Sequence, residues 1–126
     1  MLNALAVGCG GFIGAVSRYL LSTMINRAST GNFPISTLVI NFLGSFLIGV
    51  LAQLFSDLYP DNKKTQLFLS TGILGGFTTF STFSLETVNL FQNGHTLYAV
   101  LNAVLSIFFC LLGTVLGKFL IHKLYN

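Results

Sequence analysis

The sequence predicts an all-α integral membrane protein with four transmembrane helices, of which the third is broken near its middle. The composition is the first reason: 53% of the 126 residues are hydrophobic and 7% are charged, whereas a soluble domain carries roughly 25% charged residues. The distribution of charge is the second. Residues 28–56 and 87–117 contain no Lys, Arg, Asp or Glu, and each interval exceeds the roughly 20 apolar residues that cross a bilayer core.

The four helices are expected at residues 2–26, 36–57, 63–91 and 96–125, with the break in the third near residues 75–79. Segments rich in Gly, Pro, Asn, Asp and Ser separate the apolar runs, as expected of turns. Because the spans and turns use the whole chain, residues 1–126 are expected to form a single four-helix transmembrane domain. Any site must then be built within the bilayer.

Several functional classes are disfavoured by the residues present. The net charge of +3 never forms a basic run, which argues against nucleic acid as a partner. Cys9 and Cys110 lie in apolar stretches without disulfide or metal-ligand spacing, so they are expected to be packing residues. The sequence offers no paired carboxylates, nucleophile and base pair or ATP-binding loop, and we expect no enzyme activity.

The loops carry a weak charge asymmetry. If the N-terminus is cytoplasmic, the inner side holds four lysines and the outer side holds the two arginines: Lys63, Lys64, Lys118 and Lys123 against Arg18 and Arg27. Positive charge favours the cytoplasmic side, so the bias favours an inner N-terminus only slightly. So small a chain with so modest a bias can insert in both orientations, which would allow an antiparallel homodimer.

Two spans carry polar and small residues on one helical face. They recur at intervals of three and four: Thr37, Asn41, Gly44, Ser45 and Ile48 in the second span, and Asn102, Ser106, Cys110, Gly113 and Gly117 in the fourth. Close helix packing in lipid is sufficient to explain the glycines and most serines. Asn41 and Arg18 are costly at membrane depth unless they face a partner or a wet cavity, so packing and function stay open for both. Glu86 lies nearer the end of its span, where it can snorkel to water.

The third span contains the most unusual segment of the chain. Gly75-Gly76 followed by Thr78-Thr79 is expected to interrupt the helix, because glycine is conformationally free and threonine hydroxyls compete for backbone hydrogen bonds. Non-helical backbone at this depth is tolerated where it is buried in protein or lines a cavity. Its carbonyl groups are natural ligands for a cation.

Hydroxyl and phenyl side chains alternate after this segment. Phe80 and Phe83 have the spacing of a packed aromatic face, and spacing alone favours that interpretation. The positive edge of an aromatic ring can also receive a small anion. Such a contact binds weakly enough to release the ion, as conduction requires. An anion path is therefore possible on physical grounds, but the residues alone do not establish one.

Three motifs resemble the Fluc fluoride-channel family, also called CrcB proteins, and the resemblance covers essentially the whole chain. They are GGFIGAVSRY at residues 10–19, STLVINFLGSF at 36–46 and TGILGGFTTFSTFSLE at 71–86. The resemblance implies a passive fluoride-selective channel that lets cytoplasmic fluoride leave the cell and so confers fluoride resistance. It further implies a dual-topology antiparallel homodimer with two pores, located among the lipids of the bacterial plasma or inner membrane.

The resemblance also implies roles for individual residues. The family's pore phenylalanines fall on Phe80 and Phe83, and its pore asparagine falls on Asn41. A structural sodium ion would be held at the dimer axis by the backbone carbonyls of Gly75 and Thr78. The remaining pore residues would be Ser81, Thr82, Ser84, Glu86, Arg18, Thr37 and Ser106. Many relatives carry serine where this chain has Cys110, which leaves that contact in question, with Ser106 and Thr114 as other hydroxyl donors.

Two other functions compete with the channel. A small dual-topology multidrug exporter needs an intramembrane carboxylate as proton carrier. The first span contains none, and only Glu86 could serve. A non-transporting membrane subunit, whose glycines serve only association with a partner, is the other alternative.

Overall fold

The computed structural model describes residues 1–125, and these residues form helices and short connections without any strand. The helices are α1 (Leu2–Ala28), α2 (Ile35–Asp57), α3 (Lys63–Gln66), the π-helical segment η1 (Leu67–Leu74), α4 (Gly75–Phe77), α5 (Phe80–Gln92) and α6 (Thr96–Tyr125). Asn126, the last residue of the expected domain, lies outside the described residues. The all-α class is therefore confirmed for this part of the chain.

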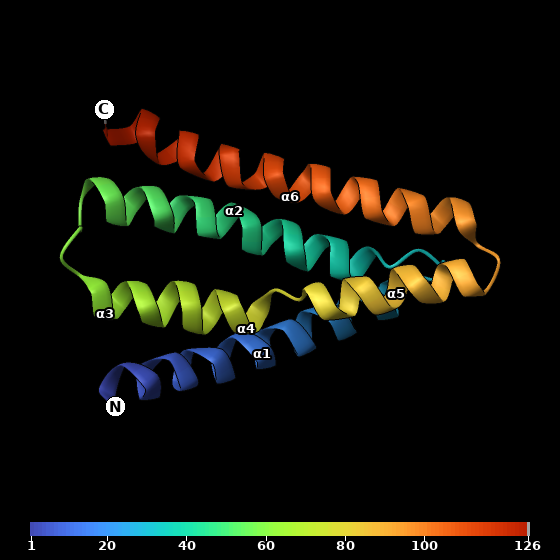
Figure 1. Cartoon of the computed structure of the whole chain (residues 1–126), viewed down its shortest axis with the longest axis horizontal. Helices are drawn as coiled ribbons and strands as arrows, with labels where there is room; N and C mark the ends of the chain where they lie inside the picture. The colour runs from blue at the N-terminus through green and yellow to red at the C-terminus, as the bar shows by residue number, and fades with distance from the viewer. Residues whose placement is uncertain (126) are drawn as a thin grey trace.

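Three of these helices, α1, α2 and α6, are long and apolar enough to cross a membrane. The third apolar segment is divided among α3, η1, α4 and α5, so no single helix in it reaches that length. Figure 1 shows the segment running beside α2 along the long axis, with α6 on one side and α1 on the other. The two termini lie at the same end, opposite the α1–α2 loop and the α5–α6 turn.

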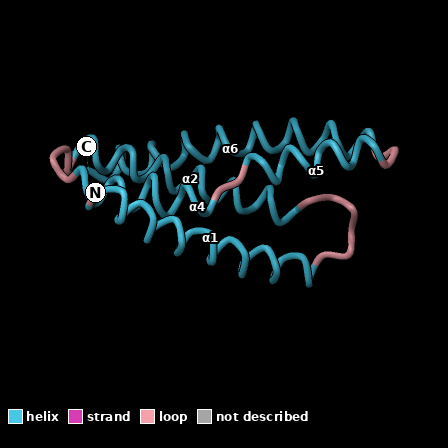
Figure 2. The backbone as a smooth tube through the Cα atoms, turned by 60° about the horizontal axis from the view of Figure 1, so that its bottom comes forward, coloured by secondary structure: helices cyan, strands magenta, loops and turns pink. Residues whose placement is uncertain are grey.

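The break in the third segment is confined to Thr78 and Thr79, which have extended backbone (φ −79°, ψ 158° and φ −152°, ψ 112°). Figure 2 shows this connection as a short loop between α4 and α5. The break lies within the expected range of residues 75–79 and falls at its threonines: Gly75 has helical angles of −62° and −38°, and both glycines belong to α4. The threonines end the helix instead.

Hydrogen bonds of the two threonines explain where the break falls. The backbone N–H and the hydroxyl of Thr78 both donate to the Leu74 carbonyl, each at 3.0 Å, which completes the last turn before the chain extends. Thr79 then caps α5, because its hydroxyl accepts from the N–H of Thr82 at 3.2 Å. A threonine at this position satisfies one of the free N–H groups at a helix start.

Small residues bring the helices into backbone contact. A Cβ added at Gly14 of α1 would overlap the Ile73 carbonyl of η1, and one added at Gly49 of α2 would overlap the Thr114 carbonyl of α6. Side chains larger than hydrogen would therefore separate these pairs. The packing role expected of the small-residue stripes is confirmed at Gly117 of α6, where an added Cβ would overlap the Phe46 carbonyl of α2.

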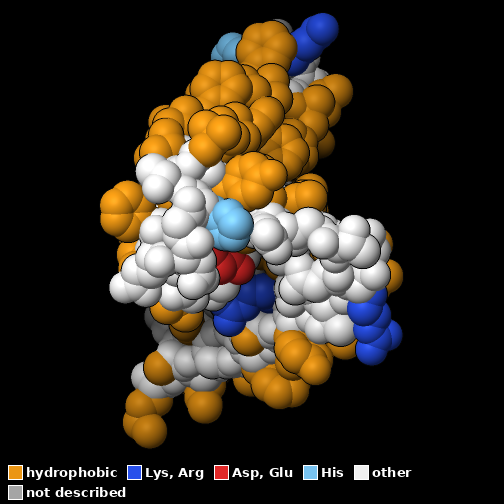
Figure 3. Space-filling model, turned by 90° about the vertical axis from the view of Figure 1, so that its right-hand side faces the viewer, with side chains coloured by type: hydrophobic (Ala, Val, Ile, Leu, Met, Phe, Trp, Pro, Cys, Tyr) orange, Lys and Arg blue, Asp and Glu red, His pale blue; other side chains and the backbone are white. Residues whose placement is uncertain are grey.

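Polar side chains are buried while large apolar ones face outward. The buried polar residues are Ser36, Thr37, Thr79, Asn102 and Ser106, each exposed by 8% or less. Long apolar side chains cover the outside of α1 and α6, and hydrophobic atoms dominate much of the surface in Figure 3. This distribution suits lipid as the solvent, where backbone and side-chain polar groups must find partners inside the protein. The chain is an integral membrane protein.

Candidate functional site

A cavity of about 430 Å³ lies directly at the helix break. It is lined by α2, by the third segment on both sides of the break, and by α6. Of the residues singled out in the sequence, it brings together Asn41, Phe80, Phe83, Ser106, Gly75 and Thr78, together with Cys110. Residues separated by more than sixty positions in the chain thus share one wall. No lysine or arginine is among the lining residues.

Asn41 holds the broken backbone from α2. Its Nδ2 donates to the Thr79 carbonyl at 3.0 Å, and its Oδ1 accepts from the Thr79 N–H at 2.8 Å. One side-chain amide therefore satisfies both backbone groups of the same extended residue, as a neighbouring strand would. Both amide atoms of Asn41, which would be costly to bury at this depth without partners, are therefore hydrogen-bonded. The structure gives Asn41 a backbone-supporting role that the sequence did not indicate.

The pairing leaves carbonyl groups of the preceding helix without helical partners. In a continuous α-helix the Gly75 carbonyl would accept from the N–H of Thr79, but that N–H donates to Asn41. The Thr78 carbonyl would accept from the N–H of Thr82, which donates to the Thr79 hydroxyl. Gly75 and Thr78 both line the cavity. These two oxygens are the donor set that a small cation would use.

Phe80 and Phe83 lie next to each other at the cavity. Their ring centroids are 5.3 Å apart, and the ring planes meet at 48°. Phe83 is half-buried, whereas 76% of Phe80 is exposed in the single chain. A phenyl ring this exposed at the first residue of α5 leaves one side of the cavity open.

The hydroxyls of α5 do not reach this cavity. Ser84 donates to the carbonyl of Phe80 in its own helix at 2.9 Å. The hydroxyls of Ser81 and Thr82 lie 3.3 and 3.0 Å from the Thr79 hydroxyl, and both residues are exposed. The hydroxyls of Ser81 and Thr82 therefore cluster with that of Thr79 at the cap of α5, and of these three residues Thr79 alone lines the cavity.

Thr37, near the start of α2, and Glu86 of α5 form a second polar pair. The hydroxyl of Thr37, which is only 5% exposed, donates to Glu86 Oε1 at 2.8 Å. Glu86 Oε2 is buried and has no hydrogen-bond partner within residues 1–125. Arg18 is half-buried on α1. Within the same residues it makes no hydrogen bond or ion pair, and it does not line the cavity at the break. Neither Thr37, Glu86 nor Arg18 shares the wall that contains Asn41.

A buried hydrogen-bond chain joins α6 to α5 behind Phe83. The Ser106 hydroxyl donates to Asn102 Oδ1 at 3.4 Å, and Asn102 Nδ2 donates to the Thr87 hydroxyl at 2.8 Å. Thr87 in turn donates to the Phe83 carbonyl at 2.8 Å. Asn102 is 1% exposed. The sequence placed Asn102 in the polar stripe of the fourth span without assigning it a role, and Thr87 carried no pattern that would have singled it out.

Replacing Asn41 by leucine should destabilise the break. We expect Asn41→Leu to lower the free energy of unfolding by about 1–3 kcal/mol, because the buried N–H and C=O of Thr79 lose their partners. Thermal unfolding in detergent, followed by size-exclusion chromatography, measures the effect. The matched control is Asn3→Leu, which changes an exposed asparagine of α1. Equal stability of the two variants would show that the pairing contributes nothing.

Comparison with known proteins assigns the chain to a family. The family described as "CrcB-like protein, Camphor Resistance (CrcB)" matches residues 5–118. A protein of Ruminiclostridium cellulolyticum described as "Fluoride-specific ion channel FluC" is 68% identical over 95% of this chain and 92% of its own length. Proteins with the same description from a Sulfurovum species and from Clostridium perfringens are 47% and 43% identical, covering 97% and 99% of this chain and 95% and 98% of their own lengths. The chain belongs to the CrcB family.

Proposed function

We propose that this chain forms a passive fluoride-selective channel that lets cytoplasmic fluoride leave the cell and so confers fluoride resistance. The observation that carries the proposal is the cavity at the helix break, where Asn41, the Phe80 and Phe83 pair and Ser106 share one wall without a lysine or arginine. Membership of the CrcB family supports it, since relatives up to 68% identical are described as fluoride-specific ion channels. The protein transports an ion and is not an enzyme.

The chemistry of the wall suits a small anion that accepts hydrogen bonds. The edges of Phe80 and Phe83 carry partial positive charge, and the Ser106 hydroxyl would have to turn from Asn102 Oδ1 to donate at the same cavity. A fixed cation would bind fluoride tightly, whereas rings and neutral donors let it leave. A membrane potential that is negative inside drives the anion outward without any other energy source.

A path for the anion out of the cell prevents fluoride from accumulating inside. Neutral HF crosses lipid and dissociates inside the cell, and the fluoride anion is then retained because charge crosses lipid poorly. A selective passive path is sufficient to release it.

The functional unit is an antiparallel dual-topology homodimer in which all four apolar segments cross the bilayer and each of two pores draws on both copies. The four segments run side by side and return the chain to the end where it began, as an even number of crossings requires. Phe80 is 76% exposed, and Ser81 and Thr82 are also exposed, so a second copy has access to all three. In the dimer, Thr37, Ser84, Glu86 and Arg18 would extend the path toward the membrane surface.

Dual topology makes a direct prediction about the C-terminus. Two reporters can be fused there in separate experiments, one active only in the cytoplasm and the other active only outside it. Both fusions should give signal in cells, because the lysine bias is too small to impose one orientation. A fusion to a protein of fixed topology calibrates each reporter. Signal from one side alone would contradict the antiparallel dimer.

A structural sodium ion fits between the copies at the break. The carbonyls of Gly75 and Thr78 would hold it, because the N–H groups that would bond them in a continuous helix donate elsewhere. Its positive charge would compensate the converging carbonyl dipoles of the two broken helices.

Removal of sodium should therefore weaken the dimer. Purification with N-methylglucamine in place of sodium is expected to shift the protein from dimer to monomer, as measured by light scattering in detergent. Thr78→Val keeps the carbonyl and removes only the hydroxyl, so its dimer should keep the same dependence on sodium. If the protein stayed a dimer in N-methylglucamine, the dimer would not depend on a cation at this site.

Fluoride release from proteoliposomes tests the channel itself. The purified wild-type chain should release trapped fluoride, read by a fluoride electrode, and should retain chloride. Phe80→Ile removes the ring edge. We expect the lost contact with the ion to be worth about 1.4 kcal/mol, which corresponds to a tenfold lower flux. Phe12→Ile is the matched control, because Phe12 is 72% exposed on α1 and lines neither cavity.

The outcomes separate the competing functions. Normal flux in Phe80→Ile would remove this ring from the pore. A silent wild-type chain would favour a non-transporting subunit, and proton-dependent drug transport without fluoride release would favour an exporter.

A further inference from the structure

A second cavity of about 430 Å³ lies at the end of the molecule that holds the α1–α2 loop and the α5–α6 turn. Four asparagines, a carboxylate and an imidazole contribute to its wall: Asn26, Asn32, Asn89, Asn93, Glu86 and His95. Figure 3 looks onto this end and shows acidic, basic and histidine side chains close together at a hollow in the surface. The cavity lies beside the last turns of α5.

The carboxyl group of Glu86 places an acidic side chain in this cavity wall, and Figure 3 shows a basic side chain beside the acidic one at this end. Glu86 Oε1 accepts from Thr37, whereas Oε2 is buried without a hydrogen-bond partner within residues 1–125. A carboxylate in a concave, low-dielectric wall raises the free energy of an anion nearby. If fluoride passes this end of the molecule, as the proposed function requires, a further positive charge in the same cavity would assist it.

His95 is fixed on the same wall by its backbone and its ring. Its N–H donates to the Leu90 carbonyl at 2.9 Å, and its carbonyl accepts from Ala99 at 3.0 Å. The imidazole lies against Tyr98, with ring centroids 6.0 Å apart, and Tyr98 meets Phe33 of the α1–α2 loop edge to face at 6.2 Å. This row of three rings holds the imidazole where the loop and the turn meet.

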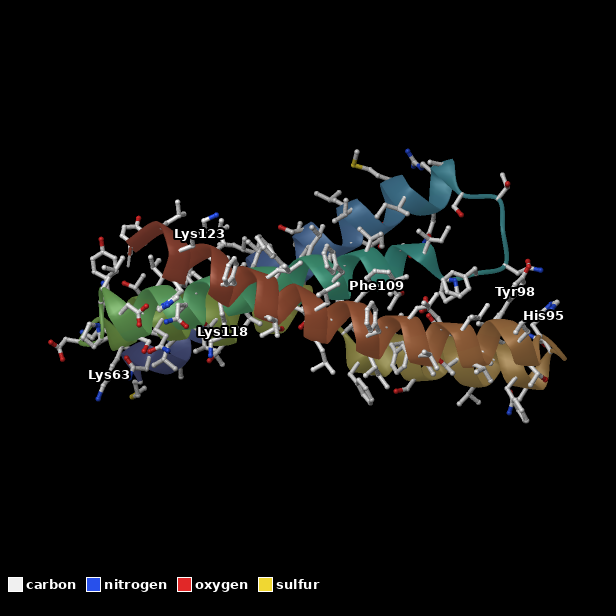
Figure 4. All side chains as sticks on the ribbon, turned by 90° about the horizontal axis from the view of Figure 1, so that it is seen from above. Lys63, His95, Tyr98, Phe109, Lys118 and Lys123 are labelled. Carbon is white, nitrogen blue, oxygen red and sulfur yellow. The ribbon has the colours of Figure 1, made fainter. Side chains whose placement is uncertain are left out.

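The ring beside His95 from α6 is Tyr98, and the basic residues of α1 are Arg18 and Arg27. Asp57, the acidic residue of α2, is at the opposite end of that helix. Figure 4 likewise shows Lys63, Lys118 and Lys123 at the end of the molecule away from His95 and Tyr98. Glu86 of α5 is the remaining titratable group in the cavity wall.

We propose that His95 is a proton-dependent anion-recruiting residue at this mouth of the fluoride path. When protonated, its imidazolium offsets the charge of Glu86 across the shared cavity and raises the local concentration of fluoride. An imidazole ordinarily changes charge between about pH 5 and 8, so the channel conducts better at an acidic membrane surface. The inference rests on the proposed function and adds to it a dependence on pH.

The pH profile of fluoride release from proteoliposomes tests this role. Wild-type flux, corrected for release from protein-free liposomes, should rise about two- to fourfold between about pH 8 and pH 5.5, as expected of one unit charge acting at high effective dielectric. His95→Gln should give a flat profile at the level that the wild type shows at high pH. His95→Lys should give a flat profile at the level of acidic pH.

The second histidine of the chain provides the matched control. His122 lies in the last turn of α6, at the end away from the α5–α6 turn, so His122→Gln should keep the wild-type profile. A wild-type profile in both His95 variants overturns the inference, and so does a profile that is lost in Glu86→Gln but kept in His95→Gln. Absence of fluoride release at every pH would instead overturn the channel itself.

Discussion

The pairing of the Asn41 amide with the backbone of Thr79 is the constraint on which the candidate site depends. A transmembrane helix cannot stop in lipid unless the backbone groups it releases find partners. Asn41 supplies a donor and an acceptor to one residue, at 3.0 and 2.8 Å. The chain can therefore extend through Thr78 and Thr79, restart at Phe80, and leave the Gly75 and Thr78 carbonyls without helical partners. Both the cavity wall and the proposed cation ligands follow from this one side chain.

The sequence predicted the helical class and the existence of a break, because charge distribution and turn residues are local properties. It placed the break within residues 75–79 without resolving that the threonines alone leave the helix, since the helix-breaking tendency of Gly75 and Gly76 is overridden where neighbouring helices pack closely. Gly76 is instead used for contact: a Cβ there would come within 2.5 Å of the Gly11 carbonyl. Thr78 and Thr79 end the helix through hydrogen bonds with Leu74 and Asn41, and the partner on α2 is visible only in three dimensions.

The candidate site was predictable to a similar degree. Resemblance to the Fluc family singled out Asn41, Phe80, Phe83 and Ser106, and these four residues share one cavity. The hydroxyls of Ser81, Thr82 and Ser84 belong to the same helix, yet they are engaged near the α5 cap or with their own backbone. Sequence spacing gives the face of a helix but not the partner opposite it. That limit also explains why Thr87, which links Asn102 to the carbonyl of Phe83, was missed.

The position of the two chain ends has a consequence for gene duplication. Both termini lie at the same end of the protein. Two copies inserted in opposite orientations therefore present the end of one and the start of the other on different sides of the membrane. A flexible soluble linker cannot join them, because the bilayer core between the two sides is about 30 Å thick. A single polypeptide that reproduces an antiparallel pair would need an additional membrane-crossing helix between its halves.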